Sequence, residues 1–118
     1  MPKARRKNDR LQQIYRWLKD NFQTPYPTKL HLRRGTGKVR HLGYVEQDGR
    51  KLNIHIDTRQ PLYVAIDSLM HEFAHAMSWR HRSMDSSVSV HSGEWGLAYA
   101  KVYRSYIDEG GIKESWNY

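Results

Sequence analysis

The segment from His71 to His75 reads HEFAH, which places two imidazoles and one carboxylate in the pattern HExxH. Residues four apart lie on one face of a helix, so both histidines can bind a single metal ion if this segment is helical. Neutral imidazole binds Zn²⁺ and leaves coordination positions open, while a glutamate between the ligands can take a proton from a metal-bound water. The motif therefore predicts a zinc site held by His71 and His75, with Glu72 as general base.

The residues around the motif have the periodicity of an amphipathic helix that begins at Pro61. Apolar residues recur along one stripe, which comprises Leu62, Ile66, Leu69, Phe73, Ala76 and Met77. At about 100° per residue, the two histidines project from nearly the opposite side of this helix. One face is expected to pack on the core and the other to present the ligands. The alternative is a pair of histidines on a solvated face or at the core edge, and the residues downstream favour the metal site.

Length and composition are typical of one soluble domain. The chain has 118 residues, 38% of them hydrophobic and 27% charged, which suits a single domain over residues 1–118 with a flexible basic tail at 1–8. No apolar run approaches the roughly 18–20 residues that span a bilayer, and the basic N-terminus is not followed by an apolar segment of a signal peptide. With no cysteine, any metal must be held by His, Asp or Glu. No membrane association and a cytoplasmic location are expected.

The net charge of +8 is compatible with contact to polyanions. Excess Lys and Arg raises affinity for nucleic acid largely without sequence preference. The basic residues are spread over several segments, so a solvated basic surface and non-specific nucleic-acid contact both remain open. Arg80 and Arg82, beside the HExxH helix, are the most suggestive of them.

The sequence before the motif predicts one helix and three strands. Asn8 or Asp9 can cap a helix that precedes Pro25. Residues 29–34, 39–45 and 51–57 alternate between apolar and polar, with turn signals at 35–37 and 47–49, which predicts three antiparallel strands in a meander. His31, His41 and His55 fall in these strands and are expected on a polar face or edge rather than at the metal.

A serine-rich loop and a final helix follow the motif. The helix carries Trp95, Ala98, Tyr99, Val102 and Tyr106 at helical spacing. Gly110 and Gly111 are expected to end it. The whole pattern predicts an α+β fold with an N-terminal helix, a three-stranded antiparallel sheet, the HExxH helix and a C-terminal helix.

A catalytic zinc usually has three protein ligands, and two further histidines are candidates for the third. His81 has the spacing from His75 that metzincins use, but Ser78 stands where that pattern needs a glycine to turn the chain out of the helix. His91, at the start of the final helix, follows a loop long enough to return to the site, and it is favoured. Glu94 is a weaker candidate, because a carboxylate there is more typical of the first turn of a helix.

The segment HEFAHA, followed by HSGEWGLAYAKVYRSY, resembles the SprT-like group of minimal zincins. Small bacterial and phage proteins of that group pair HExxHA with a downstream HGxxF/W and a tyrosine-rich helix. The resemblance covers about residues 67–106 and implies a minimal zincin fold, a zinc metallopeptidase activity, His71, His75 and His91 as ligands, Glu72 as base, and Trp95 as the aromatic residue after the third ligand. Ser92 stands where the family usually has glycine, and no cysteine-rich zinc ribbon follows.

The leading interpretation is therefore a zinc-dependent metallopeptidase that hydrolyses protein or peptide substrates. The strand at 51–57 is expected to be the edge strand that pairs with an extended substrate, as in zincins generally. Tyr99, Tyr103, Tyr106 or His81 could stabilise the oxyanion, and the sequence does not choose among them. The alternative is a basic nucleic-acid-binding accessory module with a structural or vestigial zinc site. A structural site is normally closed by four ligands and needs no base at Glu72.

Overall fold

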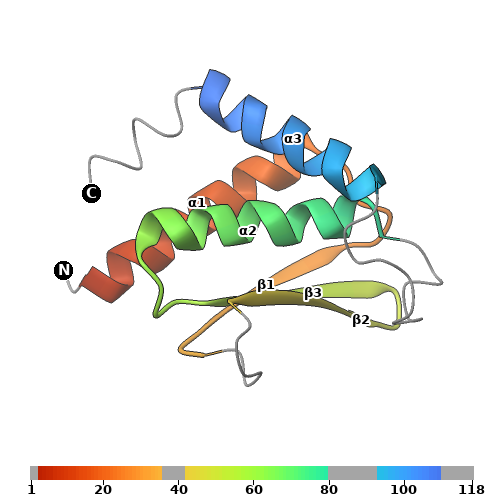
Figure 1. Cartoon of the computed structure of the whole chain (residues 1–118). Coiled ribbons are helices and arrows are strands. Elements are labelled where there is room, and N and C mark those ends of the chain that lie inside the picture. The colour runs from red at the N-terminus through yellow and green to blue at the C-terminus, as the bar shows by residue number, and fades with distance from the viewer. Residues whose placement is uncertain (1–2, 36–41, 80–92, 110–118) are drawn as a thin grey trace.

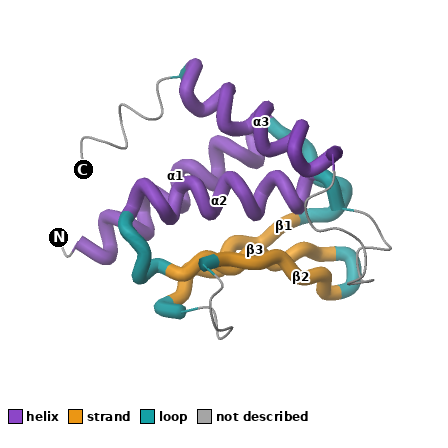
Figure 2. The backbone as a smooth tube through the Cα atoms, viewed as in Figure 1, coloured by secondary structure: helices purple, strands orange, loops and turns teal. Residues whose placement is uncertain are grey.

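Three helices and a three-stranded sheet make up the computed structural model, which describes residues 3–35, 42–79 and 93–109 (Figure 1). In chain order the elements are α1 (Lys3–Asn21), β1 (Thr28–Arg33), β2 (Gly43–Asp48), β3 (Lys51–Asp57), α2 (Leu62–Met77) and α3 (Gly93–Asp108). All three helices lie on the same side of the sheet, with α1 and α2 next to it and α3 farther away (Figure 2). The predicted α+β class is confirmed.

The sheet has the order β1-β3-β2, so the predicted antiparallel meander is wrong. β2 pairs antiparallel with β3, whereas β1 pairs parallel with β3, with Leu30 opposite Ile54. β1, β2 and β3 alternate in direction along the chain. β1 and β3 therefore point the same way, and they pair parallel because they are neighbours in the sheet. β3 takes the central place because it is the most apolar strand, while Glu46 and Asp48 suit β2 to an edge.

Element boundaries differ from the sequence prediction by a few residues. α1 begins at Lys3 rather than at Asn8 or Asp9, and β2 continues to Asp48 through the expected turn. The tight turn between β2 and β3 uses Gly49, the last residue of the predicted turn signal, whose φ of 61° is in the left-handed region that favours glycine.

The hydrophobic core lies between the sheet and the layer of α1 and α2. β3 contributes Leu52, Ile54 and Ile56, all fully buried, and α2 contributes the predicted apolar stripe, with Leu69 and Phe73 at its centre. The core face predicted for α2 is therefore confirmed. α3 packs on α2 and adds two buried side chains, Val102 and Tyr106. In the described ranges, no helix has the length and apolar character needed to cross a membrane.

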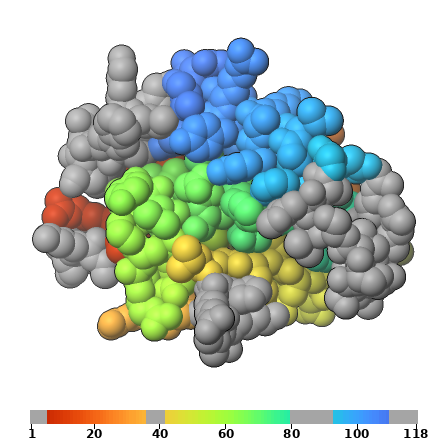
Figure 3. Space-filling model, viewed as in Figure 1, coloured from red at the N-terminus to blue at the C-terminus, as the bar shows by residue number. Residues whose placement is uncertain are grey.

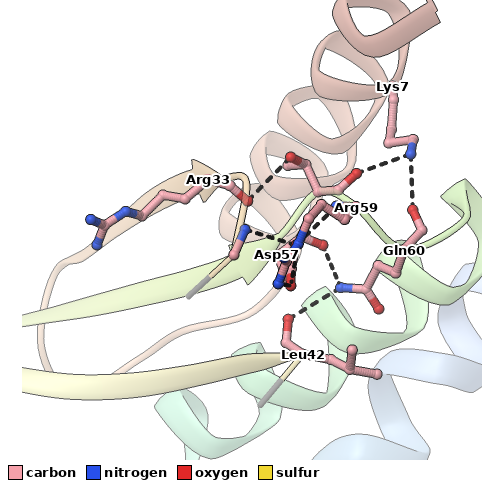
Figure 4. A network of polar contacts seen from close by, with 8 residues as sticks. Lys7, Arg33, Leu42, Asp57, Arg59 and Gln60 are labelled. Carbon is pink, nitrogen blue, oxygen red and sulfur yellow. Dashed lines mark hydrogen bonds and ion pairs between the residues drawn. The ribbon is translucent and has the colours of Figure 1, made fainter. Parts of the chain in front are cut away.

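A network of polar contacts fixes the connection between β3 and α2 (Figure 4). The buried Gln60 side chain donates from Nε2 to the carbonyl oxygens of Asp57 (2.7 Å) and Leu42 (3.1 Å), and its Oε1 accepts from the Ser68 hydroxyl (2.9 Å). Lys7 of α1 donates to the carbonyl oxygen of Gln60 at 2.9 Å. One residue thus ties the start of α2 to α1, to the end of β3 and to the segment that enters β2.

Asp57 is expected to stabilise the fold above pH 4 and to lose this contribution in acid. Its buried carboxylate accepts from the Gly35 amide at 2.9 Å and from Arg59 Nη2 at 2.8 Å. The hydrogen bonds from Arg59 hold the pKa of Asp57 well below its usual value. A carboxyl whose pKa is depressed by folding stabilises the protein above its unfolded pKa of about 4, and this stabilisation is lost as the pH falls toward the folded pKa.

The test compares urea unfolding of wild type and Asp57→Asn. At pH 7 the variant is expected to lose about 1–2 kcal/mol, since it retains an acceptor but loses charge-assisted bonds to a largely exposed guanidinium. The gap between the two proteins should narrow as the pH falls below about 4. A gap of the same size at pH 7 and pH 2.5 would show that the carboxylate charge is not what stabilises this connection.

Candidate metal centre

His71 and His75 lie on successive turns of α2, on the face turned away from the sheet core, as predicted. Their ring centroids are 5.0 Å apart and both side chains are partly buried. This spacing lets two imidazole nitrogens share one cation. Among the residues that the structure describes, no third His, Asp or Glu completes a metal-binding group with them. The candidate ligands His81 and His91 both lie outside the described residues.

Glu72 is buried beside the two histidines. Burial raises the pKa of its carboxyl to about 7, because a charge is poorly solvated there. A cation held by the neighbouring imidazoles would favour the ionised form and offset this penalty. Two imidazoles next to a buried carboxyl, in a chain without cysteine, form a donor set that fits Zn²⁺.

The first residue of β2 approaches the Glu72 side chain closely. A Cβ added to Gly43 would lie 3.0 Å from the backbone oxygen of His55, 3.0 Å from Ile56 Cδ1 and 3.1 Å from Glu72 Cγ. A side chain at this position would force the neighbouring atoms to shift by a few tenths of an ångström, so glycine suits the close approach of β2 to α2 and β3. The sequence prediction did not assign any role to Gly43, and no local pattern marks it.

The edge strand near the site is β2, which corrects the expectation for residues 51–57. β3 is the central strand and hydrogen-bonds to β1 on one side and β2 on the other, so its backbone groups are not available to a substrate. In the described part of the chain, β2 pairs on one side only. Its free edge begins beside Glu72.

Aromatic side chains of α3 cover the histidine face of α2. The Trp95 ring stacks on His75 with centroids 5.2 Å apart, and its Nε1 donates to the His71 carbonyl oxygen at 3.2 Å. The Tyr99 ring lies 5.7 Å from that of His71 and stacks on Trp95 at 5.3 Å. Two of the residues singled out in α3, Trp95 and Tyr99, thus contact the histidine pair directly.

The other candidate residues of α3 differ in burial. Tyr106 is buried in the core and Tyr103 is exposed, so Tyr99 is the tyrosine of these three that contacts His71. Glu94 is exposed in the first turn of α3, and within the described ranges it does not join a metal-binding group.

Comparisons with family models, with curated proteins and with solved structures find no match. The residues of α2, β2 and α3, and their placement by the fold, are therefore what indicates a function. The most informative of these are the two histidines and the buried carboxyl between them.

The histidines of the sheet form a separate cluster. His31 and Tyr44 stack on either side of His55, with centroids 4.7 and 4.4 Å away. His55 lies between the core residues Ile54 and Ile56 in an alternating strand, so its side chain is on the face of the sheet away from the helices. Its Nε2 is 3.0 Å from Glu46 Oε1, and burial lowers its pKa. His41 lies outside the described residues.

Proposed function

We propose that this chain is a small zinc-dependent peptidase, a minimal zincin of the SprT-like kind. His71 and His75 bind the metal, His91 is the third ligand, and Glu72 is the general base. The observation that carries the proposal is the buried Glu72 carboxyl between two histidines of one helix face, with its pKa raised to about 7. Burying a carboxyl costs stability, and a purely structural zinc site would not need it.

The chain's own residues account for the proton transfers. Zinc bound at the histidines would polarise the scissile carbonyl and acidify a water molecule. Glu72 accepts a proton from the attacking water and then donates it to the leaving amine. Burial favours the protonated form of Glu72, whereas a cation at the histidines would favour the ionised form, and these opposing effects suit a group that must first accept and then release a proton. The packing of Trp95 on both histidines holds their rings and shields this side of the site from water.

The free edge of β2 is the proposed binding site for the substrate backbone. An extended peptide can add to an exposed sheet edge through main-chain hydrogen bonds. Because Gly43 lies close to the Glu72 side chain, a peptide paired with β2 would pass beside the carboxyl of the base. Figure 3 shows the surface of α2 between that of α3 and that of the strands, so this peptide would lie over α2 with α3 on its other side.

The proposal is tested with an unfolded protein substrate such as reduced casein. The zinc-containing protein is expected to cleave casein. Treatment with EDTA should abolish cleavage, and returning one equivalent of zinc per chain should restore it. Casein supplies many extended segments, so a narrow sequence preference should still give discrete fragments. If several unfolded proteins remain intact at every zinc stoichiometry, the peptidase assignment is wrong.

A further inference from the structure

The histidine stripe of α2 continues beyond the metal centre toward the start of the helix. Asp67 and Tyr63 precede His71 at successive four-residue intervals, so all of them lie along one line on the helix surface. α3 runs antiparallel beside this line, since Trp95 contacts His75 whereas Tyr99, one turn later, contacts Asp67. The groups on this line are therefore close to any substrate that lies over α2.

Asp67 presents an exposed carboxylate framed by tyrosines. Its Oδ1 accepts a hydrogen bond from the Tyr99 hydroxyl, and the Tyr103 ring lies 6.0 Å from that of Tyr99, edge to face. Tyr103 is 37% exposed and Tyr63 is 67% exposed, so aromatic surface is accessible on both helices. Burial and the nearby Asp67 charge raise the pKa of Tyr99 well above its usual value, which keeps this hydroxyl a donor.

This carboxylate has no cationic partner within the described ranges, although the chain has 20 Lys and Arg against 12 Asp and Glu. Elsewhere in the fold, the Asp57 carboxylate pairs with the Arg59 guanidinium. An acidic group with adjacent aromatic rings attracts a cation through charge and through the faces of the rings. The apolar stem of a lysine or arginine can also cover tyrosine surface.

We propose that Asp67, with Tyr99 and Tyr103, is a substrate subsite for a lysine or arginine side chain near the scissile bond. This inference rests on the proposed peptidase function and adds the chemical class of the preferred substrate. Four residues of helix separate Asp67 from His71 by about 6 Å, and an extended peptide advances about 3.3 Å per residue. The selected side chain therefore belongs to a residue within about two positions of the cleaved bond.

The test uses fluorogenic peptides that are identical except at the positions flanking the cleaved bond, which carry lysine, norleucine or glutamate. Wild type is expected to cleave the best lysine peptide with a kcat/KM about tenfold above its norleucine counterpart. Asp67→Asn should reduce this ratio to near unity, while the amide oxygen still accepts from Tyr99. Asp67→Lys should favour glutamate. Asp20→Asn, an exposed position on α1, is the control and should keep the wild-type ratio.

A binding measurement separates this inference from the peptidase proposal. Fluorescence anisotropy of the same peptides with Glu72→Gln protein should give tighter binding of the lysine peptide, and this preference should disappear when Asp67→Asn is added. That result supports the subsite even if no peptide is hydrolysed. Cleavage without a cationic preference, or with a preference that Asp67→Asn retains, overturns the subsite and leaves the peptidase standing. Peptides that are neither cleaved nor bound in an Asp67-dependent way also overturn it.

Discussion

Glu72→Gln is expected to lower the rate of peptide hydrolysis by about 10²–10⁴-fold, which is the usual contribution of a positioned general base. Glutamine has nearly the same shape, and it leaves His71 and His75 unchanged, but it cannot accept a proton from water. The variant should therefore bind zinc like wild type. Steady-state kinetics on a cleaved peptide measures the loss, and elemental analysis of the same sample measures the metal. Normal cleavage by this variant would show that Glu72 is not the base.

Metal-free protein offers a second measurement on Glu72. Its pKa is raised by burial from 4.5 to about 7, so the folded state loses stability relative to the unfolded state as the pH rises through that window. Glu72→Gln has no such charge to bury. In metal-free protein it is expected to be at least as stable as wild type at pH 8, with a smaller advantage at pH 4, as measured by urea unfolding. An exposed control, Asp20→Asn, should show no such pH dependence.

Gly43→Ala is expected to impair both stability and hydrolysis. The added methyl would lie 3.0 Å from the His55 backbone oxygen and 3.1 Å from Glu72 Cγ, and the backbone oxygen cannot move without disturbing β3. Overpacking of this kind costs about 1–3 kcal/mol. The strain should separate the start of β2 from α2, which displaces both the substrate edge and the base. Thermal unfolding and kcat/KM on one peptide report the two effects.

Gly96→Ala is the matched control for that experiment. Gly96 lies within α3, and apart from its own helix a Cβ added there meets no atom of the described residues within 4 Å. Alanine is favoured over glycine in a helix interior by about 1 kcal/mol, so this variant should be slightly more stable than wild type and fully active. If Gly43→Ala is as stable and active as Gly96→Ala, β2 does not need its close approach to Glu72.

The parts of the fold that could be predicted are those encoded by local periodicity. The α2 stripe repeats over the whole helix, so its buried face and the opposite placement of His71 and His75 follow from sequence spacing alone. β3 was located at its correct bounds because Leu52, Ile54 and Ile56 alternate with polar residues. Such patterns can be read from the sequence because they arise from the burial of one face of the element.

The strand order could not be predicted in the same way, because it depends on competition between strands. The alternation of apolar and polar residues in β2 and β3 is compatible with either an edge strand or a central strand. The order is set by the greater apolar burial of β3 and by the charged residues of β2. Because the strand order is mispredicted from the sequence, the substrate-binding edge is assigned to β3 instead of β2. The role of Gly43 and the contact of Asp67 with Tyr99 similarly depend on residues far apart in the chain, so no local pattern announces them.

Zinc content per chain tests the central claim most directly, measured by elemental analysis of protein purified without added metal. Wild type is expected to hold about one zinc, as a site with three protein ligands should. His91→Ala should lose most of it and His81→Ala should retain it, which would also identify the third ligand. Loss with His81→Ala instead would place the third ligand at His81. Wild-type protein with little zinc, even after zinc is supplied, would contradict the metal centre and with it the proposed peptidase.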